Sequence, residues 1–147
     1  LRLVYDVTHN IAKEEEYETD GKKRRLLVHR KGATRAFPGQ PVIIPGDMGT
    51  ASYLLVGTEE ARKSYFTVCH GAGRVLSRTA AKRRVDVGKL VANLRAKGIE
   101  VRGGSKAGLA EEAPEAYKDI EQVVDAVVVN GLAKRVARLK PVCVIKG

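Results

Sequence analysis

Short apolar runs bounded by glycine or proline are the feature that most restricts the fold of this chain. Runs of this length and composition are typical of β-strands. They predict strands at residues 1–7, 24–30, 41–44, 52–56, 99–102, 133–139 and 142–145, the last two as a closing pair or as one strand bent at Pro141. Helical segments interrupt the strands in no regular strand–helix–strand order. We therefore predict an α+β fold with mixed sheets and packed helices.

Helices are expected at residues 11–18, from about 74 to 84, at 85–97 and at 115–129, with a capped helical turn at 58–61. An acidic exposed face suggests the helix at residues 11–18, and Gly98 is expected to end the helix at residues 85–97. Asp20 and Gly21 predict a turn. The apolar stripe of the last helix is formed by Ile120, Val123, Val124 and Val127. No repeat or low-complexity linker divides the 147 residues, so we expect a single domain.

The charge balance indicates a polyanionic partner. Lys and Arg number 27 against 17 Asp and Glu, a formal net charge of +10, which favours nucleic acid over acidic small molecules. A solvated basic surface is the alternative. The 2 cysteines are too few for a disulfide framework and fit a reducing compartment, and no apolar run approaches the ~18 residues that span a bilayer. We expect a cytoplasmic protein with no membrane association.

One segment joins an imidazole to a backbone suited to phosphate. Residues 65–69 are strand-like, and Cys69-His70-Gly71-Ala72-Gly73-Arg74 follows them, which predicts His70 at a strand-to-helix turn. Gly71 and Gly73 allow a ligand to approach the main chain, and free N–H groups at a helix start favour an anion. On such a helix, Arg74 and Arg78 would lie one turn apart and face the same anionic partner.

Four other segments carry side chains suited to a site. His9 can bind a metal and Asn10 can contact a nucleobase edge, with a structural histidine as the alternative. Residues 30–35 place three cations around a turn of small residues, unless this is a solvated loop. Residues 45–52 form a glycine-bearing loop of the kind that wraps a nucleotide, although ordinary tight turns share the pattern. Lys146 is either a ligand or part of a frayed tail.

The segments with the most specific sequences are Asp6-Val7-Thr8-His9-Asn10, His29-Arg30-Lys31-Gly32-Ala33-Thr34-Arg35-Ala36, Pro45-Gly46-Asp47-Met48-Gly49-Thr50-Ala51-Ser52, Cys69-His70-Gly71-Ala72-Gly73-Arg74 with Arg78, Glu112-Ala113-Pro114 with Tyr117-Lys118-Asp119-Ile120, and Lys146-Gly147. In this order they resemble the RtcB family of RNA-splicing ligases along essentially the whole chain. The resemblance covers only the C-terminal part of the family's length. The chain, which starts at Leu1 in a strand-like run, is thus expected to be the C-terminal part of a larger catalytic domain whose amino-terminal part is absent.

The resemblance implies a ligase, dependent on GTP and Mn²⁺, that joins RNA ending in a 2′,3′-cyclic phosphate or 3′-phosphate to RNA with a 5′-hydroxyl, in tRNA splicing and RNA repair. In this scheme His70 attacks the α-phosphate of GTP, the guanylate passes to the RNA 3′-phosphate, and the 5′-hydroxyl displaces GMP. The implied partners are RNA, the amino-terminal segment with most of the metal ligands, and the activating protein archease. Without that segment the chain is expected not to ligate RNA.

Residue by residue, the resemblance implies His70 as the nucleophile and His9 as a metal ligand. Lys31, Arg74 and Arg78 match basic groups around the RNA phosphate. The implied guanylate contacts are Asn10, Pro45, Gly46, Asp47, Met48, Ser52, His70, Gly71, Ala72, Gly73 and Lys146, the last reaching the guanine. Asp47 departs from the serine of many family members, because a carboxylate accepts hydrogen bonds from guanine but donates none.

Two other function classes remain open on the sequence. A non-catalytic RNA-binding module needs Lys31, Arg74 and Arg78 but has no need of His70. Another nucleotidyltransferase or a nucleotide-dependent hydrolase could share the histidine turn alone. Of the remaining residues with reactive side chains, Cys69 is expected to fill space behind the turn, Cys143 to lie in the core, and His29 to be packed or on the surface.

Overall fold

The computed structural model describes residues 2–3 and 5–146, and within them the strands form four small sheets. The sheets pair β1 (Asn10–Thr19) with β2 (Lys22–Lys31), β3 (Ala33–Arg35) with β6 (Thr67–Cys69), β4 (Pro41–Ile44) with β5 (Ser52–Gly57) and β8 (Ala133–Leu139), and β7 (Glu100–Gly103) with β9 (Cys143–Lys146). The helices are α1 (Arg78–Arg84), α2 (Val87–Ala96), α3 (Lys106–Glu111), α4 (Ile120–Val129) and the 3₁₀ turns η1 (Glu59–Ser64) and η2 (Pro114–Ala116). The predicted α+β class is confirmed.

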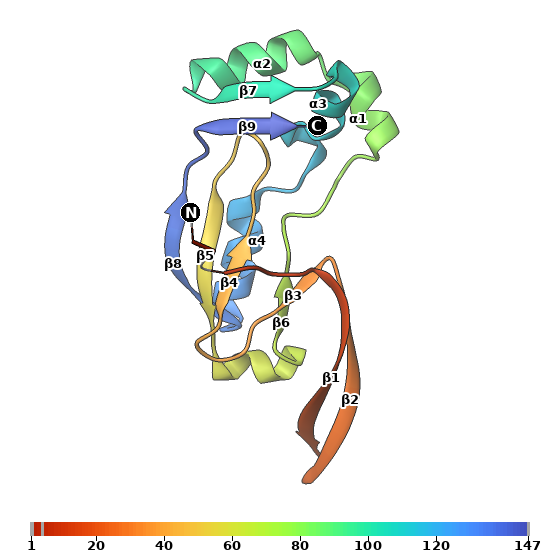
Figure 1. The fold of residues 1–147 in the computed structure, drawn as a ribbon, viewed down its shortest axis with the longest axis vertical. Helices are drawn as coiled ribbons and strands as arrows, with labels where there is room; N and C mark the ends of the chain where they lie inside the picture. The colour runs from red at the N-terminus through yellow and green to blue at the C-terminus, as the bar shows by residue number, and fades with distance from the viewer. Residues whose placement is uncertain (1, 4, 147) are drawn as a thin grey trace.

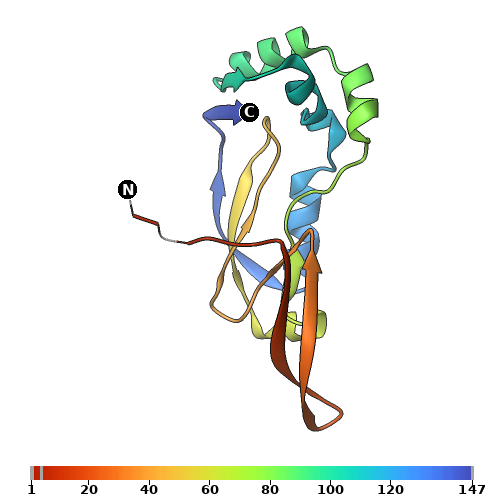
Figure 2. The ribbon, with the colours of Figure 1, turned by 45° about the vertical axis from the view of Figure 1, so that its right-hand side comes forward.

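The molecule is elongated, with three groups of elements along its length (Figure 1). The β1–β2 hairpin projects at one end, and β7 and β9 lie with α1, α2 and α3 at the other. Between them, the three-stranded sheet of β4, β5 and β8 packs against α4. The turned view shows the far half of the hairpin projecting beyond the rest of the chain (Figure 2).

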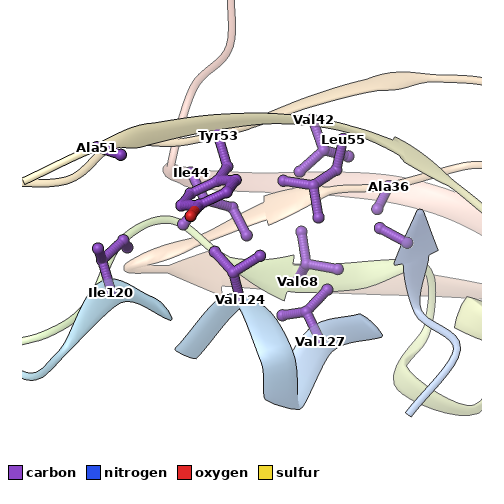
Figure 3. Close-up of a cluster of buried hydrophobic side chains, with 11 residues drawn as sticks. Ala36, Val42, Ile44, Ala51, Tyr53, Leu55, Val68, Ile120, Val124 and Val127 are labelled. Carbon is purple, nitrogen blue, oxygen red and sulfur yellow. The ribbon is translucent and has the colours of Figure 1, made fainter. Parts of the chain in front are cut away.

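The central core lies between the three-stranded sheet and α4 (Figure 3). Tyr53 and Leu55 alternate with more exposed residues along β5, so both face α4, where Val124 and Val127 meet them. Each such aliphatic side chain, once fully buried, contributes about 1.5–3 kcal/mol. The sheet therefore gives a firm base to the loop of residues 45–51 that connects β4 to β5.

A second core lies under α2 and α3, and the 45–51 loop is fixed in both cores. Met48, at 7% exposed, packs with Leu94 and Val101 in the second core. Ala51, at 3% exposed, belongs to the central core. The loop is thus held at two points, by Ala51 in the central core and by Met48 in the second core.

Several predicted strands and one helix are confirmed with small shifts of their ends. Residues 24–30, 41–44 and 52–56 lie in β2, β4 and β5, and residues 99–102 overlap β7. The helix predicted at 85–97 is α2, which Asp86 caps by accepting a hydrogen bond from Lys89 N. The two closing strands form as predicted but not as a pair, because β8 joins β5 whereas β9 runs parallel to β7.

The helix predicted at residues 11–18 is wrong, because these residues belong to β1. Glu15 and Tyr17 are buried while Glu14, Glu16 and Glu18 are exposed, which is the alternation of a strand. The turn predicted at Asp20-Gly21 is confirmed: both residues have positive φ, 54° and 68°, as a tight hairpin connection requires. A basic β2 opposite the acidic β1 completes the pairing.

Three further predictions need correction: the starts of two helices and the strand at the start of the chain. Helix α1 begins only at Arg78, with Ser77 as its cap, and α4 begins only at Ile120, since Arg74 and Tyr117 form an antiparallel bridge instead. The strand predicted at residues 1–7 is wrong for residues 2, 3 and 5–7, which lie in no strand. Its residues 1 and 4, and Gly147 of the terminal motif, lie outside the described residues.

Candidate active site

A cavity of about 620 Å³ lies where the 45–52 loop, the segment after β6 and strand β9 meet. Most of the residues to which the sequence assigned nucleotide contacts line it: Pro45, Gly46, Asp47, Met48, Ser52, His70, Gly71, Ala72, Gly73 and Lys146. The remaining lining residues are Gly32, Glu112, Tyr117, Pro141, Cys143, Val144 and Ile145. The fold therefore brings together segments that are more than a hundred residues apart in the sequence.

Hydrogen bonds within the 45–52 loop determine its shape. The Asp47 carboxylate accepts a bond from Gly49 N at 2.8 Å, and Asp47 N donates to Thr50 Oγ1 at 3.0 Å. Ser52 Oγ accepts from Gly46 N at 3.1 Å. A Cβ at Gly46 would lie 2.1 Å from the carbonyl oxygen of Ala51, so only glycine fits there. One Asp47 oxygen is thus used to hold the loop, whereas the Ser52 hydroxyl keeps its proton free to donate.

His70 lies in the cavity wall beside His9. The two imidazole rings are stacked, with centroids 3.7 Å apart and planes at 17°. His70 N donates to Gly32 O at 3.1 Å, and Asn10 Oδ1 accepts from Gly32 N at 3.3 Å. Partial burial lowers the pKa of His70, and the neighbouring His9 lowers it further. The imidazole is therefore neutral, and nucleophilic, near pH 7.

The prediction that a helix opens directly after Gly73, with His70 at a strand-to-helix turn, is wrong. Residues 70–73 have no helical structure, and α1 begins only at Arg78, so no helix N-terminus faces the imidazole. His9 and Asn10 adjoin the cavity through His70 and Gly32 without lining it.

The three cations assigned to RNA phosphate differ in their surroundings. Lys31, at the end of β2, and Arg78, at the start of α1, are exposed. Arg74 instead turns into the protein, where it donates to Leu76 O at 3.0 Å and to the Tyr117 hydroxyl at 2.9 Å. The expectation that Arg74 and Arg78 share one helical face is wrong, because Arg74 precedes the helix.

Two side chains of the cavity wall, Glu112 and Tyr117, received no role from the sequence. The Tyr117 hydroxyl donates a short hydrogen bond to Glu112. Burial raises the pKa of Tyr117, and the bond to Glu112 raises it further. Both residues lie in motifs of the family resemblance, which was the only sequence signal for them. Their place in the cavity wall depends on the backbone bridge between Tyr117 and Arg74, which lies more than 40 residues earlier in the chain.

The last residues of the described chain close the cavity from β9. Val144 packs toward the second core, so Cys143 and Ile145 lie on the opposite, exposed face of the strand. The core position predicted for Cys143 is therefore wrong, because the strand alternates its faces. Lys146 lies near Glu111, whose pKa is lowered by a hydrogen bond from Lys82 and by the charges of Arg78 and Lys146.

Other predicted roles concern residues with metal or thiol chemistry. Cys69 is partly buried against the central core, and burial raises the pKa of its thiol. His29 is exposed. Within residues 2–3 and 5–146, no three His, Cys, Asp or Glu side chains gather as a metal site would require. His9 and His70 alone do not fit a complete manganese site. Over the same residues, no helix is long and apolar enough to cross a membrane.

Comparison with known proteins places the whole chain in one group. A family model described as "tRNA-splicing ligase RtcB" matches residues 1–147. The tRNA-splicing ligase RtcB of Archaeoglobus fulgidus is 56% identical, and that of Aeropyrum pernix 50% identical, over all of this chain and 33% of each relative. The RNA-splicing ligase RtcB of Mycobacterium bovis is 49% identical over 37% of its length. The chain thus spans about a third of the length of these relatives.

Proposed function

Because this chain belongs to the RtcB family of tRNA-splicing ligases, we propose that it is part of a cytoplasmic RNA ligase that uses GTP and forms a guanylated histidine at His70. The observation that carries the proposal is the position of the His70 imidazole, whose pKa burial lowers, in the wall of a cavity bounded by the 45–52 loop and Lys146. A noncatalytic RNA-binding module has no use for a nucleophile in this position.

The proposed reaction has three transfers at phosphorus. A nitrogen of His70 attacks the α-phosphorus of GTP, so that a P–N bond forms and pyrophosphate leaves with the electrons of the broken P–O bond. The oxygen of an RNA 3′-phosphate then displaces the imidazole and takes the guanylate. Finally the 5′-hydroxyl of the second RNA attacks the activated 3′-phosphate, loses its proton and displaces GMP.

The cavity offers groups suited to each part of the nucleotide. The Ser52 hydroxyl has a proton to donate, since its oxygen already accepts from Gly46 N. Gly71 presents main chain without a side chain beside His70, where the α-phosphate is proposed to lie. We propose that Lys146 donates to the guanine and that exposed Lys31 and Arg78 contact the RNA phosphates, in keeping with the net charge of +10.

We propose that the amino-terminal part of the enzyme supplies the manganese ligands this chain lacks. Its described residues offer His9 and His70 but no third ligand near them. Exposed apolar side chains of β8, β9 and the connection between them support such a partner: Val136, Leu139, Val142 and Ile145 are each more than half exposed. The β7–β9 pair is parallel, and parallel sheets are normally covered on both faces. Archease is proposed as the activating protein.

A labelling experiment on the complete enzyme tests the proposal. Incubation with GTP labelled at the α-phosphate and Mn²⁺ is expected to leave label on the wild-type protein, and His70→Ala is expected to abolish it. His29→Ala is the matched control, because His29 is an exposed histidine away from the cavity, and it is expected to keep the label. Absence of label on the wild type, with RNA binding intact, would instead support the RNA-binding module.

A further inference from the structure

We propose that Arg74 is a positioning residue of the nucleotide cavity and not a ligand of the RNA phosphate. Its guanidinium joins the segment that carries Gly71 and Gly73 to the opposite wall, formed by Glu112 and Tyr117. This inference rests on the proposed function, because it assigns a role in binding GTP to a wall of that cavity.

Every nitrogen of the Arg74 guanidinium donates to the protein. Nε donates to Leu76 O at 3.0 Å, Nη1 to the Tyr117 hydroxyl at 2.9 Å, and Nη2 to Glu111 O. The Glu112 carboxylate lies 3.6 Å from Nη1, and the side chain of Arg74 is only 23% exposed. The guanidinium carbon also lies over the Tyr117 ring, 4.9 Å from its centroid. An RNA phosphate could reach this group only by displacing several of these contacts.

The main chain repeats the connection that the side chain makes. Arg74 and Tyr117 form an antiparallel bridge, in which Lys118 N donates to Gly73 O at 3.0 Å and Val75 N donates to Ala116 O at 2.8 Å. The glycine segment of the cavity is thereby held against the segment that carries Tyr117. Arg74 lies at the middle of this junction. Loss of its side chain should therefore loosen both the segment that carries Gly71 and Gly73 and the segment that carries Glu112 and Tyr117.

Glu112 and Tyr117 depend on Arg74 for their position. The Tyr117 hydroxyl donates to one Glu112 oxygen and accepts from Arg74, while the cation faces the other Glu112 oxygen. Without Arg74, the partly buried Glu112 carboxylate would lose its neighbouring cation, which favours its rotation toward solvent. Tyr117 would then lose the bond that fixes its ring at the edge of the cavity. GTP binding should suffer while contacts to RNA persist.

Arg74→Gln in the complete enzyme, compared with Arg78→Gln, tests this assignment. For Arg74→Gln we expect the GTP concentration that half-saturates labelling of His70 to rise about tenfold to a hundredfold, since charge-assisted hydrogen bonds are lost. The Kd for RNA with a 3′-phosphate should stay within about twofold of the wild-type value. Arg78→Gln should weaken RNA binding and leave the GTP dependence unchanged. Arg95→Gln, an exposed cation of α2, is the neutral control.

Tyr117→Phe keeps the assignment testable if Arg74→Gln fails to fold. It removes only the hydroxyl that Arg74 and Glu112 share, and it should raise the same half-saturating GTP concentration. If both single variants fold, the double variant should be no worse than the poorer of them, because they break the same link. Normal GTP dependence with lost RNA binding in Arg74→Gln would overturn the inference. A wild type that takes no label would instead overturn the proposed function.

Discussion

At the scale of single residues, a buried ion pair positions the strand that leads to His70. Arg30 and Glu15 make two hydrogen bonds of 2.8 Å, and their side chains are 0% and 6% exposed. Arg30 and Tyr17 both donate to Tyr65 O at 3.0 Å, next to two residues with positive φ, Tyr65 at 53° and Phe66 at 47°. Such backbone costs about 1–2 kcal/mol per residue, which the buried network offsets.

Glu15→Gln is expected to lower the free energy of unfolding by about 3–5 kcal/mol at pH 7, because the buried Arg30 charge loses its counter-charge. Burial alone would raise the pKa of Glu15, but the bonds and charge of Arg30 outweigh it, so the folded pKa lies below 4.5. The pair therefore stabilises fully above pH 4.5, and its contribution is lost as the pH falls through the lowered folded pKa. Denaturant unfolding at pH 7 and pH 3 measures both effects.

The control for that experiment is Glu16→Gln, which removes an exposed carboxylate of the same strand. We expect this variant to stay within about 0.5 kcal/mol of the wild type. An equal loss in Glu15→Gln at pH 7 and pH 3 would contradict the linkage to Glu15 titration.

What the sequence could predict at this scale depends on how local the determining contacts are. The residues around the cavity, such as Pro45 and Gly71, were identified because their motifs are contiguous in the chain. The burial of Arg30 and the internal bonding of Arg74 were not, since each depends on a partner at least 15 residues away. The sequence of a motif does not show whether the charged group of its arginine or lysine is exposed to solvent or bonded within the protein.

At the scale of elements, propensity misled where pairing decides the structure. Residues 11–18 contain Ala, Lys and four Glu, all acceptable in a helix. They form β1 because β2 places Arg25 opposite Glu16 and Lys23 opposite Glu18, while Glu15 and Tyr17 are buried on the other face of the strand. By contrast, β4 and β5 were predicted well, since their apolar alternation and flanking turns are local signals.

The end of β5 gives a prediction about close packing between elements. A Cβ at Gly57 would lie 2.3 Å from Phe37 O and 2.5 Å from Ala36 O, so Gly57→Ala must push two backbone segments apart. We expect it to lower the free energy of unfolding by about 1–3 kcal/mol, measured by denaturant unfolding.

Gly88→Ala in α2 is the matched substitution, because its nearest contact is the Asp86 carboxylate at 3.3 Å. Alanine favours a helix over glycine by about 1 kcal/mol, so this variant should be neutral or more stable than the wild type. Equal destabilisation by both substitutions would mean that the approach at Gly57 is not the cause.

At the scale of the whole molecule, the cavity lies where the two cores meet. Ala51 anchors the 45–51 loop in the central core and Met48 anchors it in the second core. Strand β9, which lies with β7 and helices α1 to α3, contributes Lys146 to the cavity wall. The sequence predicted the α+β class but not this arrangement, because no local signal indicates that β8 pairs with β5 while β9 pairs with β7. Because β8 and β9 pair with different strands, each leaves apolar side chains exposed, among them Val136 and Ile145.

Hydrogen exchange tests the proposed cover over these strands. In the complete enzyme, amides of β8 and of residues 142–146 are expected to exchange more slowly than in this chain alone, because the amino-terminal part should cover Val142 and Ile145. Amides in β4, which packs into the central core, should change little. Identical exchange of β8 and β9 in both proteins would contradict the proposed contact.

The position of β5 between β4 and β8 also sets an order of assembly. β4 and β5 are close in sequence, so their hairpin closes over a short loop, whereas Ser52 must find Leu139 across most of the chain. The hairpin should thus form early and shape the 45–51 loop before any cavity exists. The other walls should join only after α1 to α4 have collapsed and β8 has docked. Slow folding, if observed, should therefore appear as a delay between the first formation of the sheet and the first ability to bind nucleotide.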